Sequence, residues 1–247
     1  APNYWGVFTT ALHMLGNHKR ELKEARRGRK QMPEHLSILY NVARALSAQG
    51  ETTELQTLFE ESKTLPPQSG YSPGIIMAGA ARELRAHGFM EDSVRVLGQA
   101  LLWFESRPEQ ERASAENRYH SARIFYSLSR WDEAKPLFEG LHDDVPADVS
   151  YLGYLGAASA HQGNREEALR ISKALEDDRR PYLFGVPTYW RARIAAVLGD
   201  KESAVSLLRE AIHQGCYFSS FHPPEDLESL ADYPPFVQMM KPKGLTR

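Results

Sequence analysis

The chain has 247 residues, of which 42% are hydrophobic and 25% charged, and its formal net charge at pH 7 is −2. These values are ordinary for a soluble globular protein and exclude a disordered chain, and the near balance of charge excludes a whole-molecule attraction to nucleic acid or anionic lipid. The single cysteine, Cys216, excludes an internal disulfide and a CxxC motif. No apolar run approaches the roughly 18 residues of a membrane helix.

The compartment is not fixed by these features. We expect a soluble protein and favour the cytoplasm over the periplasm. No segment has the pattern of a secretory leader, and the chain starts at Ala1 rather than at methionine. Neighbouring segments could therefore carry an address, an anchor or an enzyme.

A short turn-like phrase recurs along the chain. Glycine stands at its centre at five places, and Ser129 replaces it at a sixth, with successive spacings of 34, 38, 41, 34 and 36 residues. Glycine tolerates the left-handed conformation that closes a helix, and Asn or Asp just after it can cap the next helix. The repeat predicts helix hairpins whose turns lie at Gly16, Gly50, Gly88, Ser129, Gly163 and Gly199.

The segments between these turns have apolar residues at helical spacing, as in Val94, Leu97 and Leu101. Almost nothing alternates with a period of two residues, so we predict no strands. The helices expected in chain order span residues 4–15, 19–31, 36–49, 53–65, 73–87, 91–106, 113–128, 132–142, 150–162, 165–177, 187–198 and 201–214.

The period breaks after residue 215. An apolar link at 218–221 precedes two short predicted helices, one opened by Pro224 and one by Pro234. The end of a repeat array needs a cap for its last hydrophobic face. The residues suited to this role are Leu227, Leu230, Phe236, Met239 and Met240.

Small residues recur where paired helices would cross. They are Thr9, Ala43, Ala81, Ala122, Gly156 and Ala192 in the first helices, and Ser93, Ala134, Ala168 and Ala204 in later second helices. Glu21 and Leu55 depart from this pattern in the first two units. With bulky Trp5, Phe59 and Phe138 and the turn at residues 131–134, the chain resembles a tetratricopeptide repeat (TPR) array. Its ending resembles the TPR regions of larger bacterial signalling proteins.

The resemblance implies an all-α fold, a right-handed α-α solenoid of about six hairpins with a C-terminal cap. We expect one domain over residues 1–215, with units at about 2–35, 36–69, 73–112, 113–148, 149–182 and 185–215, and a cap and tail at 216–247. In this family the first helices line a concave groove. The predicted groove residues are Tyr40, Asn41, Arg44, Arg82, Arg85, Tyr119, His120, Arg123, Tyr126, Tyr154, Tyr189, Trp190 and Arg193.

Arginine forks suit carboxylates, and tyrosine and tryptophan provide rigid contact area. The pattern therefore favours a protein or peptide partner, acidic in character, held in the groove. The alternative is that these arginines pair within the array and join neighbouring helices. Of the lysine and asparagine positions with which the family grips chaperone tails, only Asn41 matches, so the resemblance disfavours a chaperone-tail adaptor.

Other chemistry is weakly indicated. The basic segment 19–30 falls on an outer helix, where Glu51, Glu54, Glu60 and Glu61 of the next unit could balance it, so we expect no nucleic acid partner. The nine histidines are scattered, and we predict no metal or cofactor. No phosphate loop, GxSxG or HExxH motif occurs, so we predict no catalytic residues and no enzyme.

The sequence thus predicts a non-catalytic interaction scaffold. An alternative is a regulatory or sensor module of a larger signalling protein that binds a small anionic ligand or a neighbouring domain. A closed pocket lined by the groove arginines would favour this alternative. Self-association stays open, because the ends of solenoids can stack.

Overall fold

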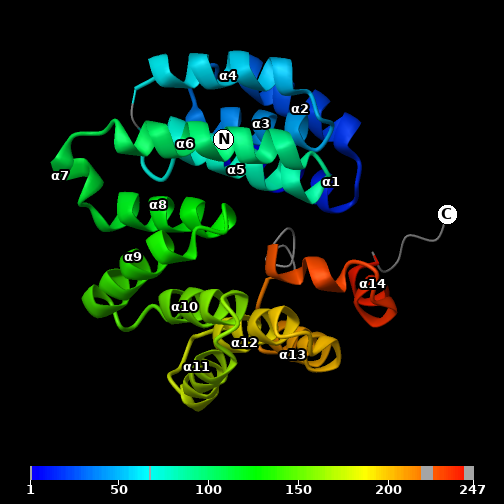
Figure 1. The fold of residues 1–247 in the computed structure, drawn as a ribbon. Coiled ribbons are helices and arrows are strands. Elements are labelled where there is room, and N and C mark those ends of the chain that lie inside the picture. The colour runs from blue at the N-terminus through cyan, green and yellow to red at the C-terminus, as the bar shows by residue number, and fades with distance from the viewer. Residues whose placement is uncertain (1, 67, 218–224, 242–247) are drawn as a thin grey trace. The chain divides into compact units, whose positions relative to one another are not determined.

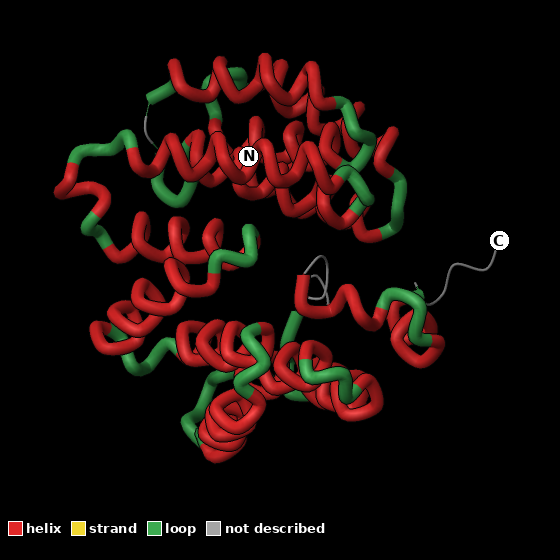
Figure 2. The backbone as a smooth tube through the Cα atoms, in the orientation of Figure 1, coloured by secondary structure: helices red, strands yellow, loops and turns green. Residues whose placement is uncertain are grey.

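The structure, a computed structural model, describes residues 2–66, 68–217 and 225–241 (Figure 1). Helices joined by short loops make up this part of the chain, and no strand occurs in it (Figure 2). An isolated bridge between Gln68 and Tyr71 lies in one loop. The prediction of an all-α fold is confirmed. None of the helices in these residues combines the length and the apolar character that a membrane crossing requires.

The chain forms two compact units, residues 1–120 and 121–247. Unit 1 is built from three hairpins, in which the first helices α1, α3 and α5 pack side by side. After them comes a short helix, α7, and the start of α8. The helices of this part are α1 (Pro2–Met14), α2 (His18–Gln31), α3 (Leu36–Ser47), α4 (Thr52–Thr64), α5 (Pro73–Ala86), α6 (Met90–Glu105), α7 (Glu109–Arg112) and α8 (Ala115–Ser127).

Unit 2 continues from α8 through three second helices and two further first helices, and α12 packs against α10, α13 and η2. Its remaining elements are α9 (Trp131–Asp144), α10 (Val149–His161), α11 (Arg165–Asp177), α12 (Val186–Val197), α13 (Lys201–His213), the 3-10 helix η2 (Glu225–Leu230) and α14 (Pro234–Met240).

The sequence predicted one uninterrupted domain over residues 1–215, whereas the boundary between the two compact units follows His120, inside α8. The connection from α6 to α8 is the longest between hairpins and contains α7, which the sequence did not predict. Helical periodicity is hard to detect in a helix of one turn, because it contains too few residues to define a face.

The six repeated turns have the predicted geometry. All five glycines have positive φ, from 69° at Gly16 to 87° at Gly88, and Ser129 adopts the same region with φ 58°. The residue after each turn donates its backbone N–H to a carbonyl five residues back, as in Asn17 to Leu12 (2.9 Å). This is the Schellman closure of a helix. The side chains of Asn164 and Asp200 then cap the following helices, as expected.

Small residues at the helix crossings are buried, as the repeat pattern predicted. Ala81 and Ala134 are fully covered, and a Cβ added at Gly156 would lie 2.6 Å from the Cδ1 atom of Ile194. Glu21 occupies the same kind of position in α2 and has no exposed surface. An ionisable group has replaced a small residue there, and it determines the local chemistry described below.

The C-terminal elements cover the end of the last hairpin. Leu227 and Leu230 are buried against α12 and α13 together with Cys216, and the partly buried residues packed on them include Phe236, Met239 and Met240. These are the side chains to which the sequence analysis assigned the cap. The apolar link at 218–221 and the proline at 224 lie outside the described residues.

Candidate functional site

Asp226 of η2 is the centre of a buried polar cluster in unit 2. Its Oδ2 atom accepts a hydrogen bond from Nε of Arg193 at 2.6 Å. Its Oδ1 atom accepts one from Tyr126 at 2.8 Å and lies 2.7 Å from Nε2 of His161. Tyr126, His161 and Arg193 come from α8, α10 and α12, so one carboxylate joins all three first helices of this unit.

The charges in this cluster are matched. Burial raises the pKa of the Asp226 carboxyl, but the Arg193 guanidinium and the bonds from His161 and Tyr126 outweigh it and hold that pKa below its usual range. Arg193 also lies over three aromatic rings, with its Cζ atom 3.8 Å from the centroid of Trp190, 5.3 Å from Tyr154 and 5.6 Å from Tyr189. Cation–π contacts of this kind add to the ion pair.

Five of the predicted groove residues are therefore brought together in unit 2. They are all buried. Tyr126 and Arg193 bond to Asp226, and the three remaining rings lie against Arg193. For these residues the structure favours the alternative of pairing within the array. The residues concerned are Tyr126, Tyr154, Tyr189, Trp190 and Arg193.

Arg44 in unit 1 is also held within the fold. It is 9% exposed, and its Nε donates to Oε1 of Glu21 at 2.8 Å. Its two terminal nitrogens donate to Thr10 (2.8 Å) and Thr9 (3.1 Å). Arg44 thus joins α3 to α1 and α2, which again favours the pairing alternative.

Asn41 lies one turn before Arg44 on α3 and has a different environment. Asn41 is 6% exposed, and it lines a hollow of about 460 Å³ together with Gly6, His35, Ser37, Gln68, Ser69 and Tyr71. The ring of Tyr71 packs edge-on against Tyr40, with centroids 5.8 Å apart. Of the predicted groove residues, Asn41 and Tyr40 thus lie at or beside a hollow formed by α1, α3 and the loop between α4 and α5.

Four predicted residues lie on α5 and the start of α8 in unit 1, and all are partly exposed: Arg82, Arg85, Tyr119 and His120. The His120 ring stacks on Phe104 at 5.6 Å. Burial, with a smaller contribution from the Arg82 charge, lowers the pKa of His120 to about 4. Arg123, also partly exposed, follows on α8 in unit 2.

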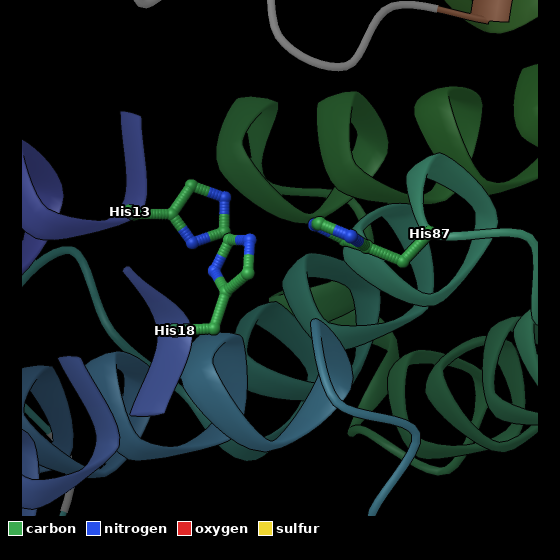
Figure 3. Close-up of side chains that lie close together, drawn as sticks. All are labelled: His13, His18 and His87. Atoms are coloured by element: carbon green, nitrogen blue, oxygen red, sulfur yellow. The ribbon is translucent and has the colours of Figure 1, made fainter. Parts of the chain in front are cut away.

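Three histidines meet in unit 1, which the sequence did not predict. His13 lies in the last turn of α1, His18 begins α2, and His87 follows α5 (Figure 3). The carboxylates of Glu21 and Glu83 lie 2.8 Å and 3.1 Å from the two ring nitrogens of His13. Burial lowers the pKa of His13, but the bonds to these carboxylates outweigh it and raise the pKa to about 9. The signal in the sequence was Glu21, an acid at a position for small residues.

The outer helices carry two further features. Arg26 and Arg29 of the basic helix α2 pair with Glu54 and Glu61 of α4, so the predicted balance of charge is confirmed for these two arginines. A larger hollow, of about 1100 Å³, lies between α4, the loop before α5 and the end of α6, with Trp103 among its lining residues. The sequence did not predict this hollow, because its walls come from segments that are far apart in the chain.

The repeated turns, the buried small residues and the side-by-side first helices define the class of a helical-hairpin repeat protein. Residues 185–210, which include α12 and most of α13, match the family model of the tetratricopeptide repeat. Over this span the chain thus resembles a tetratricopeptide repeat. No curated protein shows significant similarity to the sequence.

Several solved structures resemble the chain. BtubC (BKLC) from P. vanneervenii has 16% sequence identity and a TM-score of 0.46, covering 86% of this chain and 93% of that one. PilF of Pseudomonas aeruginosa has 12% identity and a TM-score of 0.43, covering 97% of each chain. YrrB, a TPR protein with an unusual peptide-binding site, has 16% identity and a TM-score of 0.37, covering 77% and 91%. Likenesses at this level carry no information about function.

Proposed function

We propose that the chain is a non-catalytic scaffold for protein–protein interaction, and that the first helices of unit 1 hold an extended, acidic segment of the partner. Tetratricopeptide repeats generally serve as interaction modules rather than as enzymes, and stacked hairpins provide long binding surfaces. The observation that carries the proposal is the hollow lined by Gly6, Asn41 and Tyr71.

The lining of this hollow suits a peptide backbone. The Asn41 side chain offers both a donor and an acceptor, which can pair with the C=O and N–H of an extended chain. A Cβ added at Gly6 would meet no atom within 4 Å, so the α1 side of the hollow is open to an incoming segment. Tyr71 supplies a rigid aromatic wall of the kind common in binding hot spots.

The preference for acidic segments rests on charge. Arg82 and Arg85 are partly exposed on α5, the first helix next to α3. In unit 2 the corresponding row of first helices holds Asp226 through Arg193. The same pairing of arginine with a carboxylate supports an acidic ligand for unit 1. Among the described residues, no aspartate or glutamate of the chain lines the hollow. Neither of the two hollows described above is lined by Arg44, Arg82, Arg123 or Arg193, so we do not favour the small-anion alternative.

A library of extended peptides with graded net charge tests the proposal. We expect affinity to rise with negative charge, and we expect Asn41→Ala and Arg82→Glu each to weaken the best peptide about tenfold or more, which corresponds to about 1.4 kcal/mol. Lys173→Glu, on the exposed face of α11, is the matched control. Circular dichroism confirms that each variant is folded. Binding that ignores peptide charge and both substitutions would contradict the proposal.

A further inference from the structure

The histidine cluster of unit 1 has the composition of a metal site. His13, His18 and His87 each offer one ring nitrogen, and these three atoms lie within 4.8 Å of one another. The rings approach one another with centroid distances of 4.8 Å between His18 and His87 and 5.0 Å between His13 and His18. Figure 3 shows the three rings converging from separate elements.

The spacing is close to what an ion requires. Zinc binds imidazole nitrogen at about 2.0–2.1 Å in tetrahedral geometry, which places neighbouring ligand atoms about 3.4 Å apart. The nitrogens must therefore approach one another by at most about 1.4 Å. His13 is fixed, with 3% of its side chain exposed, whereas His18 and His87 are each 21% exposed and have room to rotate.

Glu21 supplies the outer carboxylate that histidine ligands usually have. Its Oε2 atom lies 2.8 Å from Nδ1 of His13 and 3.3 Å from Nδ1 of His18. Arg44 fixes the other oxygen at 2.8 Å. A carboxylate on Nδ1 orients each ring and directs Nε2 toward a metal. One buried acid thus orients two of the three imidazoles.

Glu83 lies on the opposite side of His13. Its Oε2 atom is 3.1 Å from Nε2 of His13 and 3.9 Å from Nε2 of His87. Glu83 thus lies beside the Nε2 atoms of both rings. The set of three imidazoles and one carboxylate matches the preferences of Zn²⁺ and related ions, for which imidazole is a common ligand.

We propose that His13, His18 and His87 bind a divalent transition-metal ion of the Zn²⁺ class, with Glu83 as the fourth ligand and Glu21 as the residue that orients His13 and His18. Bound metal would join α1, α2 and the end of α5, and would stabilise the row of first helices in unit 1. The competing interpretation is a polar lock without metal, in which the imidazole–carboxylate contacts alone join these helices.

The test is calorimetric titration of Zn²⁺ into chelator-treated chain that carries no affinity tag. We expect one ion per chain and a higher Tm with Zn²⁺ present. The double variant His18→Gln/His87→Gln should lose more than the 10- to 100-fold in affinity that is typical for removal of an outer partner. His213→Gln, an exposed histidine at the end of α13, is the matched control and should bind as the parent does.

Co²⁺ absorption and a single variant provide a test that does not depend on the stability of the double variant. Co²⁺ in the same site should give the visible absorption of a four-coordinate ion, and His18→Gln alone should remove it if the double variant proves unstable. No Zn²⁺-dependent change in Tm of the parent chain would overturn the proposal. Equal Zn²⁺ affinity in the double variant and the His213→Gln control would overturn it as well, because binding would then come from other histidines.

Discussion

A guanidinium buried as deeply as that of Arg193 requires a counter-charge, because an isolated ion in the interior is strongly destabilising. Asp226 supplies it, and Tyr126 and His161 satisfy its remaining acceptor positions. A buried ion pair adds little free energy of folding compared with an apolar pair of the same size. The main effect of this pair is therefore to fix the position of η2.

Removal of only one partner of the ion pair lowers stability far more than replacement of both partners by apolar residues. We predict that Asp226→Asn destabilises unit 2 by about 3–5 kcal/mol, because it leaves the Arg193 charge buried and unbalanced. Urea unfolding of the variant measures the loss. Asp232→Asn, an exposed aspartate in the turn before α14, is the control and should change stability by less than about 0.5 kcal/mol.

His120 makes the stability of unit 1 depend on pH. Its pKa in the folded chain is lowered to about 4 from the ordinary value of 6.5, so between these two values the unfolded chain binds a proton that the folded chain does not. We expect no contribution from His120 above about pH 6.5, and a progressive loss of stability as the pH falls toward 4.

The comparison is with His120→Phe, which keeps a ring on Phe104 and removes the titrating group. The free energy of unfolding of the parent chain should fall relative to this variant as the pH is lowered from 6.5 to 4. A difference between the two chains that stays constant over this range would show that His120 does not remain neutral in the fold.

Each repeated turn between paired helices contains one residue with positive φ. Ser129 holds the left-handed conformation at a turn where the other five repeats have glycine, and a side chain in that region costs roughly 1–2 kcal/mol. We predict that Ser129→Gly stabilises unit 2 by about 1 kcal/mol. Gly199→Ala should destabilise it by a similar amount, because a Cβ there has open space and only the φ of 83° opposes it.

Thermal unfolding of the two variants measures both effects. The pair is informative because neither substitution removes a packed side chain. If Ser129→Gly lowers Tm, the serine hydroxyl contributes more stability than the backbone strain costs. The turn at Ser129 would then be stabilised differently from the five turns that contain glycine.

Elements of this fold could be predicted from the sequence because their signals are local. A glycine with positive φ, the polar residue after it and the apolar spacing of the flanking helices all lie within one repeat. The segment α7 was missed because four residues carry no periodicity. The basic helix α2 could also be interpreted locally, since its neighbours in α4 carry the acids that pair with Arg26 and Arg29.

The candidate sites could be predicted only in part, because they depend on residues far apart in the chain. Arg193 and Asp226 are separated by 33 residues, and a row of arginines does not show which of them the chain itself will neutralise. His13 and His87 lie in different hairpins, so their meeting could not be seen in the spacing of histidines. Glu21, an acid where the pattern requires a small residue, was the available sign of a polar core.

At the scale of the whole molecule, the C-terminal segment completes unit 2. Leu227 and Leu230 are buried on the last hairpin, and burial of a leucine contributes about 1.5–3 kcal/mol. We predict that a chain ending at Gln214 loses several kcal/mol of stability and binds an apolar dye, whereas a chain ending at Lys241 behaves as the parent. Dye fluorescence with urea unfolding distinguishes the two. A stable, dye-free chain ending at Gln214 would mean that the hairpins need no cap.

The two units therefore differ in what their first helices do. In unit 2 the row of aromatic residues and Arg193 is occupied by the chain's own acid, and in unit 1 the row beside Asn41 borders a hollow. Because of this difference we propose unit 1 as the binding surface, and unit 2 is an internal example of the same chemistry.

The most direct test of this account is NMR chemical-shift mapping of the labelled chain with the tightest acidic peptide of the graded library. The account predicts that the largest shifts fall on α1, α3 and α5 and include the side-chain amide of Asn41. Shifts confined to the outer helices α2, α4 and α6, or to unit 2, would contradict it and would place the binding surface elsewhere.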